Sequence, residues 1–182
     1  MSKKSSISNT VRTLTLSAML VAFSMLFASY AKAIPDTFLR ITFENLPILF
    51  GAVLFGPFWA GAIACCADIL SCVLIGGYAP NPILTCGIVS VGLVAGIMCK
   101  LFGKQRRFSP LVLFVSVFAA HIVGNMIIKS YGLYYMGLLG SFKLVLLYRV
   151  PNYILIATCE YIALLLLFRN KAIRKLCNER IK

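Results

Sequence analysis

Long apolar runs constrain the fold of this chain more than any other feature of its sequence. Of its 182 residues, 60% are hydrophobic and 13% are charged, and the mean hydropathy is +0.92. A helix of about 20 apolar residues crosses the roughly 30 Å hydrocarbon core of a bilayer. The runs cover residues 12–31, 46–55, 58–75, 84–102, 111–128 and 142–168. We therefore expect an all-α membrane protein, a bundle of six transmembrane helices in a single integral membrane domain over residues 1–182.

The weakest of these spans is 46–55, which ends at Gly56-Pro57 and forms either a short helix or half of a broken one. If Gly56-Pro57 is a turn, six spans place 13 basic residues on the side of both termini and five on the other side. Five spans give a weaker asymmetry. Because cytoplasmic loops carry the excess of Lys and Arg, the six-span arrangement predicts that both termini are cytoplasmic in a multi-pass protein of the cell membrane.

Several other classes of protein are disfavoured. The net charge of +13 would suggest nucleic acid in a soluble protein, but here the basic residues flank apolar runs, so we expect no nucleic-acid partner. Seven cysteines without a Cys-x-x-Cys pair, and the distant His121, predict neither a metal site nor another cofactor. No phosphate-binding loop, nucleophile elbow or zinc-protease motif occurs, which argues against an enzyme.

Polar residues inside the spans are costly in hydrocarbon and mark cavities or partners. His121, Asn125 and Lys129 recur at every fourth position, and Arg149, Asn152 and Glu160 share a face of the last span. We interpret Arg149 and Asn152 as ligand contacts or as helix-pinning groups. His121 is interpreted as a packing residue with Glu160 as its partner.

With six spans, the segments 36–45, 76–82 and 129–149 share the face opposite the termini. They hold the stiff Pro80-Asn81-Pro82 turn and the tyrosines Tyr78, Tyr131, Tyr134 and Tyr135. Asp68 in the third span either contacts a ligand, caps a helix or pairs with Arg149. Basic groups with aromatic neighbours suit an organic anion that carries flat rings. The candidate binding residues are Arg40, Phe43, Asp68, Tyr78, Asn81, Asn125, Lys129, Arg149 and Asn152.

Three motifs carry a family resemblance. They are Leu39-Arg40-Ile41-Thr42-Phe43-Glu44-Asn45-Leu46-Pro47, then Phe55-Gly56-Pro57-x-x-Ala60-Gly61, and Asp68-x-Leu70-Ser71. Together they resemble the S components of energy-coupling factor (ECF) vitamin transporters. The loop Gly76-Gly77-Tyr78-Ala79-Pro80-Asn81-Pro82 and the stretch Tyr148-Arg149-Val150-Pro151-Asn152 look most like the folate-specific subfamily.

This resemblance implies a six-helix subunit that captures a vitamin, here folate, from outside and hands it inward. Its partners would be a transmembrane T component and two ATP-binding cassette ATPases, which hydrolyse the ATP. Ala18 and Ala22, whose spacing lets another helix approach closely, match the family's docking motif on the first helix.

Two alternatives stay open at this point. One is an S component for another vitamin or related micronutrient. The other is a proton-coupled secondary transporter in which Asp68, His121 and Glu160 relay protons.

Overall fold

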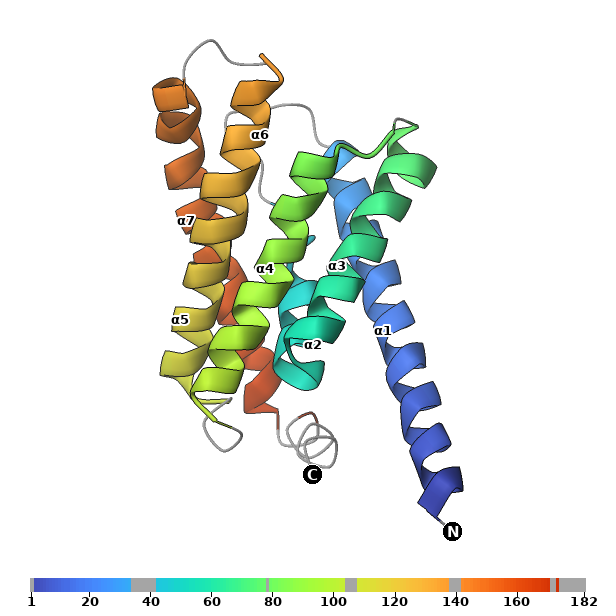
Figure 1. The fold of residues 1–182 in the computed structure, drawn as a ribbon. Helices are drawn as coiled ribbons and strands as arrows, with labels where there is room; N and C mark the ends of the chain where they lie inside the picture. Colours follow the sequence, from blue (N-terminus) through green and yellow to red (C-terminus); the bar gives the residue numbers. More distant parts are fainter. Residues whose placement is uncertain are drawn as a thin grey trace.

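A computed structural model describes the backbone of residues 2–33, 42–77, 79–103, 108–137, 142–170 and 173. It describes the side chains of residues 10–30, 42–77, 79–103, 108–137, 146–147, 149–170 and 173. Arg40 and Tyr78 lie outside these ranges. Within the described parts of the chain, every regular element is a helix (Figure 1).

The helices follow one another through short connections. In chain order they are α1 (Ser2–Ala33), α2 (Leu46–Phe55), α3 (Pro57–Leu70), η1 (Ser71–Gly76), α4 (Pro82–Leu101), α5 (Pro110–Ala120), η3 (His121–Ile128), α6 (Lys129–Tyr135) and α7 (Phe142–Arg169). The elements η1 and η3 are π-helical continuations of α3 and α5. As a result, α5, η3 and α6 form one long helix over Pro110–Tyr135.

Five helical segments in the described chain are long and apolar enough to cross a membrane: Thr10–Tyr30, Pro57–Gly76, Pro82–Leu101, Pro110–Tyr135 and Arg149–Arg169. The expected six spans therefore do not all appear at full length. The sixth, α2, has only 10 residues, which at 1.5 Å per residue cover about half of the hydrocarbon thickness.

Although α2 is short, successive helices still alternate in direction along the chain. The helices run up and down the bundle in turn, so α1 begins and α7 ends at the same end (Figure 1). We call this end the terminal end and the other the distal end.

Proline and glycine set several helix boundaries, including the break at Gly56-Pro57 that the sequence suggested. Gly56 has a φ of 88°, a conformation that favours glycine, and it separates α2 from α3. Pro57, Pro82 and Pro110 each occupy the first position of a helix, where the missing N–H is not needed.

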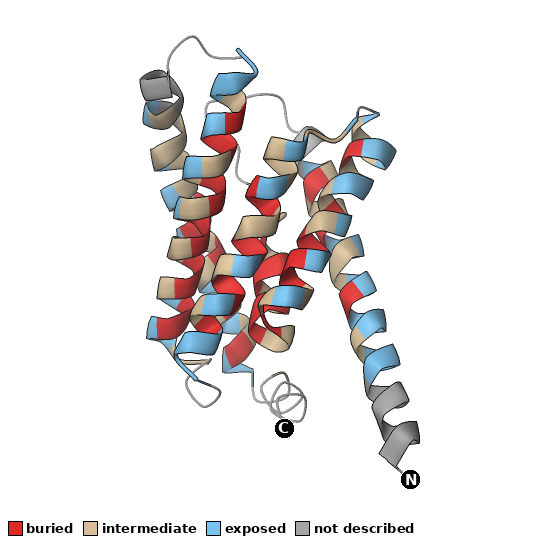
Figure 2. Cartoon of the chain, viewed as in Figure 1, coloured by how far each residue is buried: buried red, intermediate tan, exposed pale blue. Residues whose placement is uncertain are grey.

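The centre of the bundle is closely packed (Figure 2). Helices α3 and α4 approach through Gly92 and Gly96, where an added Cβ would lie 2.7 Å from Ala60 O and 2.4 Å from Pro57 Cα. Near the terminal end, Phe168 stacks on Phe50 with ring centroids 5.4 Å apart. These contacts pack α3 against α4 and α2 against α7 beneath the distal end.

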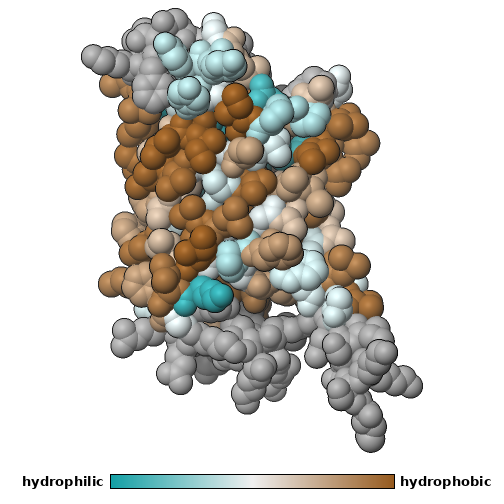
Figure 3. Space-filling model, viewed as in Figure 1, coloured by the Kyte–Doolittle hydropathy of each residue, from teal (hydrophilic) through white to brown (hydrophobic). Residues whose placement is uncertain are grey.

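The exterior is also apolar. Large hydrophobic side chains such as Phe58, Leu74 and Leu166 are more than half exposed. Brown and tan side chains predominate on the visible flank, and paler and teal side chains gather at the distal end (Figure 3). This distribution is that of a chain whose surrounding solvent is lipid.

Candidate functional site

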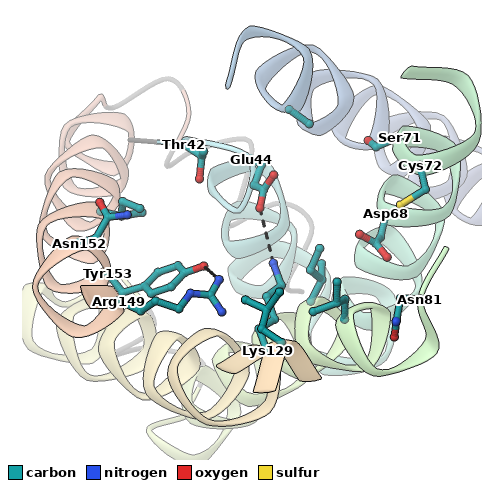
Figure 4. A pocket seen from close by; sticks show the side chains of 15 residues that line it. Thr42, Glu44, Asp68, Ser71, Cys72, Asn81, Lys129, Arg149, Asn152 and Tyr153 are labelled. Atoms are coloured by element: carbon teal, nitrogen blue, oxygen red, sulfur yellow. Dashed lines mark hydrogen bonds and ion pairs between the residues drawn. The ribbon is translucent and has the colours of Figure 1, made fainter. Parts of the chain in front are cut away.

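A cavity of about 430 Å³ lies in the distal half of the bundle. Its size is within the range of roughly 300–1,000 Å³ that is usual for small-molecule sites. The polar lining residues are Thr42, Glu44, Asp68, Ser71, Cys72, Asn81, Lys129, Arg149, Asn152 and Tyr153, and the apolar ones are Ala28, Leu84, Ile88, Leu133 and Ile156. They come from α1, the segment before α2, α3, η1, α4 with its N-cap, α6 and α7, so several separate helices form the wall of the cavity (Figure 4).

Lys129 and Glu44 form an ion pair across the cavity. Lys129 Nζ lies 3.6 Å from Glu44 Oε1, which is too long for a direct hydrogen bond. The Lys129 side chain is 9% exposed and that of Glu44 is 28% exposed. Glu44 is itself held to α1, because Ser24 Oγ donates a 2.7 Å hydrogen bond to its backbone oxygen.

Arg149 provides the second cation. Its Nη2 donates a 2.7 Å hydrogen bond to Tyr153 Oη one helical turn further along α7, so the tyrosine orients the guanidinium. The other terminal nitrogen, Nη1, is buried without a hydrogen-bond partner among the described residues. In Figure 4 the guanidinium points from α7 into the cavity. A buried N–H group of this kind costs free energy until an acceptor reaches it, so Arg149 is prepared for an anionic ligand.

Asp68 lies on the opposite wall from Arg149 (Figure 4). Its Oδ2 accepts a 2.6 Å hydrogen bond from Thr85 Oγ1. Of the three roles considered for Asp68, pairing with Arg149 is not seen among the described residues. The carboxylate therefore faces the cavity as an acceptor of ligand N–H or O–H groups.

Asn81 lines the cavity but also has a structural role. Its Oδ1 accepts a hydrogen bond from Ile83 N at 2.9 Å, which caps the first turn of α4. Its Nδ2 contacts Met136 Sδ at 3.2 Å and so joins the start of α4 to the end of α6.

Below the cavity lies a separate buried network. Glu160 Oε2 is 2.7 Å from His121 Nε2, and His121 Nδ1 is 2.9 Å from Asn125 Nδ2. All three residues are at most 1% exposed. The predicted pairing of His121 with Glu160 is confirmed. Asn125, in contrast, is not brought into the cavity lining.

The structure thus brings five predicted site residues together around one cavity: Asp68, Asn81, Lys129, Arg149 and Asn152. Phe43 lies beside the lining residues Thr42 and Glu44 but packs on Phe27, with ring centroids 6.4 Å apart. Arg40 and Tyr78 are outside the described residues.

Sequence reasoning missed Glu44 and Tyr153 as site residues. Glu44 is one of only five acidic residues in the chain, a rarity that is itself a signal in a membrane protein. Tyr153 stands four positions after Arg149, where helical neighbours meet. Within the described residues, no group of three or more His, Cys, Asp and Glu side chains is arranged to hold a metal ion.

Comparison with known proteins identifies the family to which this architecture belongs. The family model of the ECF transporter substrate-specific component matches residues 12–169, which is most of the chain. No curated protein matches the chain. Members of this family are not enzymes but membrane subunits that bind a small-molecule substrate and work with a T component and ATPases. The cavity, the apolar exterior and this match together show that the chain is a multi-pass membrane protein and belongs to the substrate-specific components of ECF transporters.

Proposed function

We propose that this chain is the folate-binding subunit of its transporter and that folate occupies the cavity of about 430 Å³. The observation that carries the proposal is the opposition of charges across the cavity. Arg149 and Lys129 stand on one side and Asp68 on the other (Figure 4). Folate has matching ends, because its glutamyl tail carries two carboxylates and its pterin ring carries adjacent N–H donors.

The placement of folate follows from these charges. A tail carboxylate accepts from Arg149 Nη1, which has no hydrogen-bond partner among the described residues. Lys129 contributes the second positive charge, and Arg40, which is outside the described residues, remains a candidate contact. The pterin ring donates to Asp68 or contacts Asn152, and Tyr153 offers an aromatic face beside Arg149.

The proposed topology has six crossings with both termini in the cytoplasm, α2 being the short second one. This arrangement places 13 basic residues on the cytoplasmic side and opens the cavity to the exterior. Cysteine introduced at exposed Ala79, in a background without native cysteines, tests the orientation. A membrane-impermeant maleimide should label Ala79→Cys in intact cells but label Leu101→Cys only after permeabilisation. The reverse pattern would contradict the proposed orientation.

The proposed ligand is tested by calorimetric titration of the purified chain with folate, without ATP and without partner subunits. We expect one folate per chain to bind tightly, because the cavity is complete within the subunit. Absence of folate binding together with tight binding of another vitamin would contradict the folate assignment and leave the family role intact.

A proton-coupled secondary transporter is the second candidate, and the buried His121–Glu160 pair is the observation that favours it. Uptake that collapses with a protonophore but persists without the ATPases would support that candidate. The proposed ATP-driven role predicts the opposite dependence.

A further inference from the structure

A second, much smaller cavity of about 30 Å³ adjoins the first, between α1, the start of α2 and α3. Five of its lining residues carry side-chain oxygen atoms: Ser24, Glu44, Asn45, Asp68 and Ser71. Glu44, Asp68 and Ser71 also line the larger cavity, so the two spaces share a wall.

Asn45 supplies a buried acceptor oxygen to the wall of this small cavity. It occupies the N-cap position of α2, where an asparagine usually accepts a hydrogen bond from the first turn, yet its side chain makes no such bond. The residue is 1% exposed, and Oδ1 is buried without a hydrogen-bond partner among the described residues. Such an oxygen costs free energy unless a donor or a cation reaches it.

The neighbouring groups are also acceptors. Ser24 Oγ donates its hydrogen bond to the backbone oxygen of Glu44, so its lone pairs can still accept one. Asp68 receives one hydrogen bond, from Thr85 to Oδ2. Among the described residues, the Glu44 carboxylate contacts Lys129 Nζ at 3.6 Å and accepts no direct hydrogen bond from it. A set of carboxylate, amide and hydroxyl oxygens is the environment that hard cations select.

Size and charge both favour a small monovalent ion. A cavity of about 30 Å³ holds one small ion or one water molecule. The described lining of the larger cavity carries two carboxylates and two cationic side chains, so it is balanced without a ligand. The two carboxylates of folate, bound at Arg149 and Lys129, give this lining an excess of negative charge, and a cation beside Glu44 and Asp68 offsets part of it.

We infer that the small cavity is a cation site of sodium size, with Asn45, Asp68, Ser71 and Glu44 supplying oxygen ligands. The site couples cation binding to the anionic occupant of the larger cavity through the shared carboxylates.

The site is tested on the purified full-length chain without folate, by thermal unfolding in NaCl and in choline chloride at equal concentrations. Choline is too large for the small cavity. We expect Tm to rise with NaCl in a saturable manner relative to choline, because an ion that binds only the folded state stabilises it. Equal Tm values in the two salts would overturn the site and leave a water molecule in its place.

Two variants locate the effect. Asn45→Ala and Ser71→Ala should each abolish the sodium-specific shift, and Ser71→Ala carries the test if Asn45→Ala does not fold. Asn45→Asp, which keeps an oxygen at the position, should retain the shift, and so should the exposed control Asn170→Ala. A shift that persists in both Asn45→Ala and Ser71→Ala would overturn the assignment.

The coupling between the cation site and folate binding rests on the proposed function, and its own measurement is folate affinity in the two salts. Replacing NaCl by choline chloride should weaken folate binding about 5- to 150-fold, the usual range of coupling between two sites. A sodium-specific Tm shift without any folate binding would support the cation site and contradict the proposed ligand. Folate binding that is the same in both salts would contradict the coupling.

Discussion

At the scale of single residues, Arg149 is the group most clearly prepared for a ligand. Tyr153 fixes one side of the guanidinium through a 2.7 Å hydrogen bond, while Nη1 remains buried without a partner in the described part of the chain. The interaction with Tyr153 also places the guanidinium carbon 5.1 Å from the ring centroid. Little side-chain freedom is therefore lost when an anion binds.

The variant Arg149→Ala should weaken folate binding about 10- to 150-fold, because charge-assisted hydrogen bonds contribute about 1.5–3 kcal/mol. Titration calorimetry of the purified variant checks this. Arg169→Ala is the matched control, since Arg169 is exposed at the far end of the same helix. Unchanged affinity in Arg149→Ala would remove Arg149 from the site.

Gly87 positions Lys129 through its lack of a side chain. An added Cβ at Gly87 would lie 2.5 Å from Lys129 Cγ and 3.1 Å from Gly124 O. We expect Gly87→Ala to displace the Lys129 side chain and to weaken ligand binding at least fivefold, measured in the same titration. In the control Gly61→Ala, the nearest atoms to the added Cβ belong to side chains, with Leu93 Cδ2 at 3.1 Å and Val89 Cγ1 at 3.8 Å. Equal affinities for the two variants would contradict this role.

The site residues that could be predicted from the sequence share one property. Asp68, Lys129, Arg149 and Asn152 stand out because each is a polar residue in or beside an apolar run. Asn125 has the same property but instead bonds to His121 beneath the cavity. Sequence periodicity identifies the polar face of a helix but not the depth at which a neighbouring helix closes over it.

At the scale of elements, the π-helical segment η3 determines what α5 and α6 present. It begins at His121 and ends at Ile128, directly before Lys129. Widened helical turns of this type occur often at functional sites. Here His121 and Asn125 of this segment lie in the buried network, and Lys129, which follows it, lines the cavity.

The His121–Glu160 pair joins η3 to α7, the helix that carries Arg149. Glu160→Ala should lower the free energy of unfolding by about 3–5 kcal/mol, because it leaves His121 buried without its partner. Thermal or denaturant unfolding in detergent measures the loss. Glu160→Gln, which keeps a hydrogen-bonding side chain, should be affected far less.

Thr158→Ala provides the control on the same turn of α7, since Thr158 is exposed and bonds only within its own helix. A Glu160→Ala variant as stable as Thr158→Ala would show that the pair does not hold the two elements together.

The end of α2 at Gly56-Pro57 was predictable, because glycine and proline interrupt the apolar run there. The end of the fifth span was not predicted correctly. The apolar run was expected to end at Ile128, yet the helix continues to Tyr135. Lys129, Ser130 and Gly132 interrupt the hydrophobic pattern, but all three are buried against neighbouring helices. Tertiary packing thus sustains a helix where the local pattern suggested a loop.

At the scale of the whole molecule, α1 is the least enclosed of the long helices. Only 17% of its apolar window is buried inside the bundle, against 44% for Pro110–Tyr135. Ala18 and Ala22 are both exposed on it. Small side chains on an exposed helix leave room for a neighbouring helix, as the proposed docking to the T component requires.

Replacing Ala18 and Ala22 by Trp should abolish ATP-driven uptake by the assembled transporter while folate affinity of the isolated subunit stays unchanged. The physical reason is steric, because bulky side chains prevent close helix approach. Uptake assays and titration measure the two effects. The control Ala62→Trp, at an exposed alanine of α3, should leave uptake intact. Uptake that survives the double substitution would contradict docking through this face.

The central claim is that one subunit, without its ATPases, encloses folate in the cavity between α3, α4, α6 and α7. Mass spectrometry of the small molecules that copurify with the wild-type chain and with Arg149→Ala tests this most directly. Cells supplied with folate should yield about one folate per wild-type chain and much less with the variant. Equal amounts in the two preparations, or a different compound in the wild-type chain, would contradict the claim.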